Sequence, residues 1–105
     1  MERMAWKGRI KPGCKAEYRR RHDEIWPELV DVLKAAGICN YSIFCCGDEL
    51  FGYYECEKGI AYAEQTQAGS PVVDRWNDYM QDVLELEMDP NTGAQPKLQQ
   101  MFLLE

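Results

Sequence analysis

Histidine is almost absent from this sequence: His22 is the only one among 105 residues. A metal centre that needs two imidazole ligands is therefore excluded. The cysteines offer no substitute, because their number, five, is odd and no C-x-x-C pair occurs. We expect no metal ion and no cofactor. We also expect the thiols to be reduced and mostly buried, as is usual in a cytosolic protein. A catalytic role for them is not expected, since no activating base is visible beside them.

Positive charge is scarce as well. Lys and Arg number 12 against 18 Asp and Glu, which gives a net charge of −6. Nucleic-acid binding needs clustered basic side chains. The one dense basic run, at positions 19–21, is flanked by acidic residues at 17, 23 and 24. We therefore expect no nucleic-acid partner.

Long apolar runs are missing too. No stretch approaches the roughly 20 residues that cross a bilayer. The N-terminal segment MERMAWKGRI lacks the uninterrupted apolar core of a signal peptide. We expect a soluble protein that stays in the cytoplasm and does not associate with membranes.

The residues that are present suit one globular domain. The sequence is 46% hydrophobic and 11% aromatic, which is typical of a folded protein. A chain of 105 residues has room for one core and little room for two. We interpret residues 1–105 as a single domain.

Hydrophobic periodicity predicts alternating strands and helices. The expected elements, in order, are a strand over 3–10, a helix over 14–36, strands over 38–46 and 49–57, a weak helix over 58–68, a helix over 71–84, a loop over 85–97 and a strand over 98–104. Pro27 lacks an amide hydrogen and disfavours a helical residue before it, so we expect the first helix to break between Asp23 and Trp26. This order predicts an α+β protein with a ferredoxin-like four-stranded antiparallel sheet and helices on one face.

The predicted sheet is apolar on both faces, as the segments LFGYY and MFLL indicate. Helices cover only one face, and an exposed apolar face of that size usually marks an interface. A second copy related by a two-fold axis is the simplest cover, so we expect a homodimer. The alternative is a monomer in which the 85–97 loop folds over the sheet, but that loop is acidic and mostly polar.

Candidate chemistry lies on the inward face of the first helix, where Tyr18 and His22 are four residues apart. In the predicted fold Tyr41 lies on a neighbouring strand and Trp76 on the inward face of a later helix. Together they suit a sugar, whose C–H faces stack on aromatic rings while its hydroxyls need polar groups. The alternative is a buried histidine held by hydrogen bonds, with the aromatic residues as core.

The sequence resembles the L-rhamnose mutarotases. The stretches that carry the resemblance are YRRRHDEIWPEL at 18–29, NYSIF at 40–44, RWNDYM at 75–80 and LQQMFLL at 98–104. The resemblance implies a dimeric ferredoxin-like α+β barrel that exchanges the α and β pyranose anomers of L-rhamnose. It implies His22 as the acid–base residue and Tyr18, Tyr41 and Trp76 as sugar contacts. Asn77 is a further candidate contact, at a position where members often carry a second tryptophan.

Anomer exchange asks little of a protein. A proton goes to the ring oxygen and another leaves the anomeric hydroxyl, and histidine is suited to both tasks near neutral pH. The second proton-transfer group is open between Tyr18, Tyr41 and a bound water. Asp23 and Glu24 qualify only if the helix break turns them inward. Two other functions use the same fold, a cofactor-independent monooxygenase and a non-enzymatic sugar-binding module.

Overall fold

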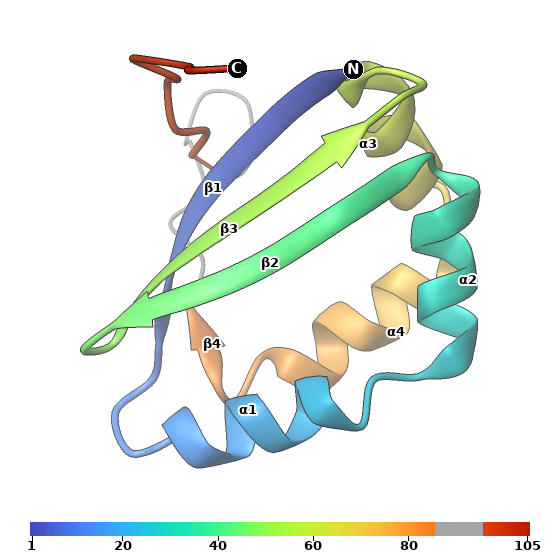
Figure 1. Cartoon of the computed structure of the whole chain (residues 1–105). Coiled ribbons are helices and arrows are strands. Elements are labelled where there is room, and N and C mark those ends of the chain that lie inside the picture. The colour runs from blue at the N-terminus through green and yellow to red at the C-terminus, as the bar shows by residue number, and fades with distance from the viewer. Residues whose placement is uncertain (86–95) are drawn as a thin grey trace.

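The protein is built around a twisted antiparallel sheet (Figure 1). A computed structural model describes residues 1–85 and 96–105, and in these residues the sheet has four strands in the order β2-β3-β1-β4. The strands are β1 (Glu2–Ile10), β2 (Ile38–Cys46), β3 (Glu49–Cys56) and β4 (Leu84–Glu85). All pairings are antiparallel. The predicted ferredoxin-like α+β class is confirmed.

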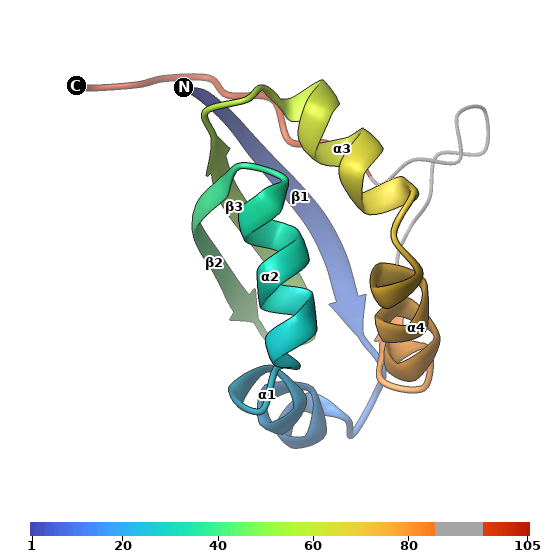
Figure 2. The same ribbon diagram turned by 90° about the vertical axis from the view of Figure 1, so that its right-hand side faces the viewer.

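Helices pack against one side of this sheet (Figure 2). Those in the described part of the chain are α1 (Lys15–Asp23), α2 (Pro27–Ala35), α3 (Ile60–Ala68) and α4 (Pro71–Met80). The predicted break in the first helical segment is confirmed, because Trp26 is extended (φ −63°, ψ 131°) and Pro27 begins α2. The segment therefore forms two short helices, set at an angle to each other, in place of one long straight helix.

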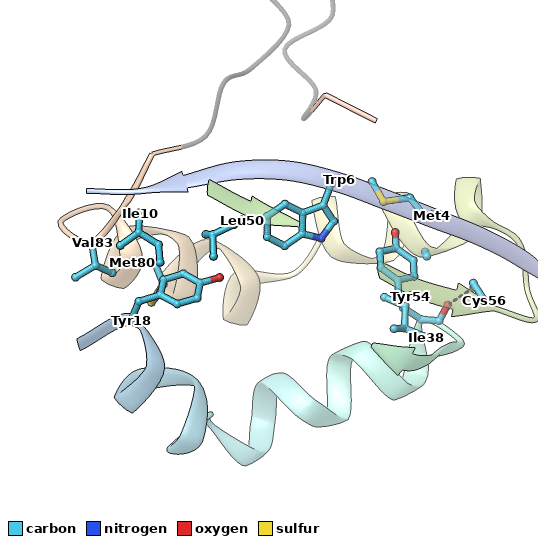
Figure 3. Close-up of a cluster of buried hydrophobic side chains, with 12 residues drawn as sticks. Met4, Trp6, Ile10, Tyr18, Ile38, Leu50, Tyr54, Cys56, Met80 and Val83 are labelled. Atoms are coloured by element: carbon cyan, nitrogen blue, oxygen red, sulfur yellow. Dashed lines mark hydrogen bonds between the residues drawn. The ribbon is translucent and has the colours of Figure 1, made fainter. Parts of the chain in front are cut away.

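The core lies between the sheet and the helices (Figure 3). Alternate residues of β1 and β3 face it, as the period of a strand requires. These residues are Met4, Trp6, Gly8 and Ile10 on β1 and Leu50, Gly52, Tyr54 and Cys56 on β3, all of them buried. The alternation predicted for the first strand is confirmed.

Two predictions near the C-terminus are wrong, one for the end of a helix and one for a strand. The helix predicted over 71–84 ends at Met80, because Leu84 pairs with Ile10 and forms the fourth strand. The strand predicted over 98–104 is not a strand in the structure. The loop predicted over 85–97 lies, except at its ends, outside the described residues.

The C-terminal tail, residues 98–104, meets β1 only briefly. Lys97 bridges to Trp6, and the Leu98 amide donates to the Ala5 carbonyl over 2.8 Å. In that antiparallel register, residue 102 would stand opposite Met1, so the chain beyond it has no residue of β1 left to pair with. The tail instead runs past the sheet, on the side away from the helices (Figure 1). Met101, Phe102 and Leu104 are more than three-quarters exposed.

The outer face of the sheet mixes apolar and charged side chains. Phe44 is 66% exposed there, and Phe51 and Tyr53 on β3 are half-buried. Ion pairs surround them, for example Arg3 with Glu55 at 3.8 Å and Lys7 with Glu49 at 3.9 Å. None of the helices in residues 1–85 or 96–105 has both the length and the apolar character needed to cross a bilayer.

Candidate active site

One cavity of about 630 Å³ opens between the sheet and the helices. Its volume falls in the range of roughly 300–1,000 Å³ that small-molecule sites occupy. All five residues singled out from the sequence line it: Tyr18, His22, Tyr41, Trp76 and Asn77. Three elements, α1, β2 and α4, therefore converge on one space, although the residues are up to 59 positions apart in sequence (77 − 18).

A buried arginine holds α1 in place at this cavity. Arg21 is 8% exposed, and its guanidinium donates to the Tyr79 carbonyl over 2.6 Å and to the Asp82 carboxylate over 2.8 Å. It also donates to Glu17 over 2.6 Å and lies 4.3 Å from the Tyr79 ring centroid. These bonds tie α1 to the end of α4, and so bring His22 close to Trp76.

The same contacts explain the basic run in the sequence. Arg19 pairs with Asp23, and Arg20 pairs with Glu17 and Glu24. Together with Arg21, each guanidinium of the run is matched by carboxylates of its own chain. The run is therefore an internal ion-pair network in this structure and not a free basic surface.

His22 is anchored through one ring nitrogen. Its Nδ1 lies 3.1 Å from the Tyr18 carbonyl oxygen. Because a carbonyl only accepts, Nδ1 carries the hydrogen and the neutral ring keeps its lone pair on Nε2. Burial lowers the pKa of His22 below its usual value, more than the Tyr18 carbonyl and the nearby Asp23 charge raise it. Near neutral pH the ring is therefore uncharged and ready to accept a proton.

Aromatic rings enclose this imidazole. The Tyr18 ring centroid lies 4.4 Å away, and the Trp76 ring meets it edge-on at 5.5 Å. Trp76 is braced from behind by Trp26, at 5.1 Å and nearly perpendicular, and by Tyr79 at 5.7 Å. The cavity wall beside His22 thus presents flat apolar surfaces in fixed orientations.

Tyr41 faces the cavity because β2 contains a bulge. The pairing shifts by one residue between Cys39 and Ser42, and Asn40 adopts a left-handed conformation with φ 50°, which asparagine tolerates better than most residues. The extra residue turns Tyr41 toward the helices, where its hydroxyl accepts a hydrogen bond of 3.0 Å from the Trp6 indole.

Both phenols at the cavity stay protonated near neutral pH. Burial raises the pKa of Tyr41 to about 12, although the Trp6 hydrogen bond lowers it in part. Burial likewise raises the pKa of Tyr18, with smaller contributions from Tyr41 and Cys45. Both side chains can therefore act as hydrogen-bond donors to a bound ligand.

Other polar residues line the cavity that the sequence did not single out as site residues, namely Lys15, Arg19 and Gln67. Gln67 comes from α3, a weak helix in sequence terms, and no pattern in the sequence points to it. Trp6 also lines the cavity, although its spacing in β1 indicated only core. Asp23 reaches the cavity beside Arg19, whereas Glu24 is held at 2.6 Å by Arg20 on the exposed side of α1.

No metal site is built into the described part of the chain. Within residues 1–85 and 96–105, no three His, Cys, Asp or Glu side chains gather closely enough to hold an ion. The cavity's polar groups are instead an imidazole, phenols and amides, together with the charged side chains of Lys15, Arg19 and Asp23. The fold and this cavity define the class of protein: a ferredoxin-like α+β domain whose cavity, lined by an imidazole and aromatic rings, has the volume of a small-molecule site.

Comparisons with known proteins identify the family within that class. A family model described as L-rhamnose mutarotase matches residues 3–104. An L-rhamnose mutarotase of Burkholderia ambifaria is 40% identical over 105 residues and is matched over the full length of both chains. One from Jannaschia sp. (strain CCS1) is 40% identical over 96 residues, which are 91% of this chain and 92% of the relative.

A solved structure agrees with these matches. The crystal structure of L-rhamnose mutarotase from Formosa agariphila superposes with a TM-score of 0.81 at 32% sequence identity and covers 100% of both chains. The chain belongs to the L-rhamnose mutarotase family, a family of isomerases. The resemblance that the sequence predicted is confirmed, and these matches favour the mutarotase over the oxygenase and the binding module.

Proposed function

We propose that this protein exchanges the α and β pyranose anomers of L-rhamnose, with His22 as the acid–base residue. The observation that carries the proposal is the anchored imidazole. Its Nδ1–H is held by the Tyr18 carbonyl, so Nε2 is the nitrogen available to a ligand in the cavity. General acid–base assistance of this kind is typically worth about 10²- to 10⁴-fold in rate.

The reaction begins with neutral His22. Nε2 takes the proton from the anomeric hydroxyl while the ring oxygen gains one, the bond between C1 and the ring oxygen breaks, and the open-chain aldehyde forms. Rotation about the C1–C2 bond presents the other face of the carbonyl. The ring oxygen then attacks that face and gives up its proton, the imidazolium returns its proton to the carbonyl oxygen, and the second anomer results.

The group that protonates the ring oxygen is a phenol or a water bound by one. Tyr18 is adjacent to His22, and Tyr41 contributes a second hydroxyl to the cavity. Their raised pKa values disfavour a free phenolate, so such a phenol passes a proton on and regains one within the same turnover. Asp23 lines the cavity but is paired with Arg19, which favours a structural role for it.

Sugar contacts follow from the shape of the wall. Trp76 offers an aromatic face for the C–H groups of the pyranose, and Tyr41 and Asn77 offer hydrogen bonds to its hydroxyls. Asn77 is exposed at the cavity rim. Its small polar side chain leaves the rim wide enough for a close 6-deoxyhexose, which we propose as an alternative substrate.

We propose that residues 1–105 act as one domain and that two copies form a homodimer through the outer sheet face. The exposed Phe44 and the unpaired apolar tail of residues 98–104 support this, because both leave apolar surface that a second copy would cover. We place the protein in the cytoplasm, where its five free thiols would remain reduced.

Saturation-transfer NMR of the two anomeric protons tests the proposal directly. Added protein should speed exchange in L-rhamnose, and a panel of 6-deoxyhexoses would rank the substrates. Polarimetry of freshly dissolved crystalline L-rhamnose gives an independent rate. Binding without faster exchange would indicate a sugar-binding module, and oxygen uptake would indicate a monooxygenase; either result contradicts the mutarotase.

A further inference from the structure

The cavity contains a hydrogen bond that the reaction above does not use. The Trp6 indole donates to the Tyr41 hydroxyl over 3.0 Å, and this bond joins strands β1 and β2 across the intervening β3. Trp6 is 4% exposed, and its ring hangs from β1 toward the helices (Figure 3). An indole nitrogen can only donate, so the direction of this bond is fixed.

A glycine makes room for that ring. Gly52 on β3 is the register partner of Trp6. A Cβ added to Gly52 would stand 2.0 Å from Trp6 Cε2 and 2.2 Å from Nε1, which is well inside atomic contact. The indole therefore lies flat over the glycine, and this position carries its N–H across β3 to reach Tyr41.

By accepting this hydrogen bond, the Tyr41 hydroxyl is left to act toward other partners as a donor. A phenol has one hydrogen to donate and can accept through its oxygen. The indole occupies the acceptor side and polarises the O–H bond, which strengthens it as a donor. The hydroxyl hydrogen must then point away from Trp6, and Tyr41 lines the cavity.

We propose that Trp6, seated over Gly52, is a positioning residue that fixes Tyr41 as a hydrogen-bond donor toward the bound sugar. This inference rests on the proposed function, because it requires Tyr41 to contact the substrate. It assigns Tyr41 to binding a sugar oxygen and leaves proton transfer from the anomeric hydroxyl to His22. The contact is formed in the bound sugar and in the transition state alike, so its loss should raise KM and leave kcat nearly unchanged.

A double-mutant cycle tests this. Tyr41→Phe and Trp6→Phe should each raise KM for L-rhamnose exchange by roughly three- to tenfold, the value of one hydrogen bond. The double variant should be no worse than the more severe single variant, because Trp6 acts through the Tyr41 hydroxyl. Effects that multiply would show that Trp6 acts independently and would overturn the inference.

Met4→Ala is the matched control for lost core packing. Met4 lies two residues before Trp6 on the same buried face of β1 and is absent from the residues that line the cavity. Its truncation should lower the melting temperature without raising KM. A rise in KM equal to that of Trp6→Phe would mean that general loosening of β1 explains the effect, and the inference would fail.

Indole NMR gives a readout that needs no Trp6 variant to be active. The three tryptophans give three indole N–H signals, and Tyr41→Phe should shift the Trp6 signal far more than the others and speed its exchange with solvent. An unmoved Trp6 signal overturns the inference. If wild-type protein fails to speed anomer exchange, the proposed function fails instead. If added L-rhamnose then also leaves the Trp6 signal unmoved, the inference fails as well.

Discussion

At the scale of single residues, the neighbours of His22 determine its tautomer and its protonation state. The Tyr18 carbonyl fixes which nitrogen carries the hydrogen, and burial keeps the ring neutral. Both effects work toward one state, an imidazole with a lone pair on Nε2. The surrounding rings of Tyr18 and Trp76 then exclude water from much of its surface.

Removing this imidazole should cost activity more than stability. We expect His22→Ala to lose roughly 100-fold or more in anomer exchange, the low end for an acid–base group. The variant should stay folded, because the ring is only half-buried and its one hydrogen bond is to a backbone carbonyl. Melting temperature and exchange rate are measured on the same sample. A structural histidine would give the opposite result, a loss of about 1–3 kcal/mol with little change in rate.

The pH dependence follows from the lowered pKa of His22. The neutral ring is the active form, so exchange should rise with pH through a midpoint below about 6.5 and then level off. Folding stability should respond in the same direction. The unfolded chain binds the His22 proton more tightly than the folded one, so this residue's contribution is present above about pH 6.5 and declines as the pH falls toward the folded pKa.

Rate and melting profiles between pH 4.5 and 8, for wild type and His22→Ala, check both statements. The difference in melting temperature between the two proteins should change with pH only on the acid side. A rate that falls as the pH rises toward neutrality would show that the imidazolium is the active form and would contradict the neutral-base assignment.

At the scale of elements, the sequence predicted correctly those features that depend on residues close to one another in the chain. Pro27 predicted the break between α1 and α2, and the period of two in β1 predicted which side chains are buried. The same signals placed Tyr18 and His22 on one helix face. All of these depend on neighbours within about one turn or one strand.

Elements whose partners are distant in sequence were predicted less well. The apolar pattern of residues 98–104 suits a strand, but the segment is joined to β1 only near Trp6, and residues 102–104 would run past the first residue of β1. Leu84 fits a helix pattern, yet it pairs with Ile10, 74 positions earlier (84 − 10). Trp6 and Gln67 line the cavity because of how the sheet and α3 pack, and neither position carries a local sign of this.

The hydrogen bonds by which Arg21 joins α1 to the end of α4, here called the Arg21 clamp, lead to a prediction at this scale. Arg21→Met should lower the melting temperature by roughly 5 °C or more, because Asp82 and the Tyr79 carbonyl lose their shared donor. It should also slow exchange, since α1 carries His22 and α4 carries Trp76. The neighbouring Arg20→Met is the control, because Arg20 is itself exposed and its ion pairs are with Glu17 and Glu24, neither of which belongs to α4. Equal melting temperatures for the two variants, measured by calorimetry, would contradict a stabilising role for the Arg21 clamp.

At the scale of the whole molecule, the two sides of the sheet are unequal. The helix side is packed and contains the cavity. The outer side leaves Phe44 exposed, and the tail of residues 98–104 adds further apolar surface. Surface of this kind on a free monomer favours self-association, and the ion pairs at its margins, such as Arg3 with Glu55, would supply a polar rim.

A charge placed in the tail should disturb the proposed dimer. We expect Phe102→Asp to shift the protein from dimer toward monomer, by at least tenfold in the dissociation constant, because the charge would have to be buried. Tyr62→Asp is the matched control: Tyr62 is 43% exposed but lies on α3, among the helices. Light scattering at micromolar concentration measures both. A monomeric wild-type protein, or equal shifts in the two variants, would contradict the proposed interface.

The bulge at Asn40 has a consequence for how this gene can change. It puts two residues of β2, Asn40 and Tyr41, opposite one residue of β3, and this odd count alone sends Tyr41, Ile43 and Cys45 inward. Loss of the single codon for Asn40 would leave charge and hydrophobicity almost as they are. It would also leave the two faces of the strand as they are, because Tyr41 would then stand alone opposite Tyr54 and only the bulge would be lost. Loss of the codon for Ser42 would instead turn Ile43 and Cys45 to the outer face with the bulge kept, so the position of a lost codon decides its effect on the cavity.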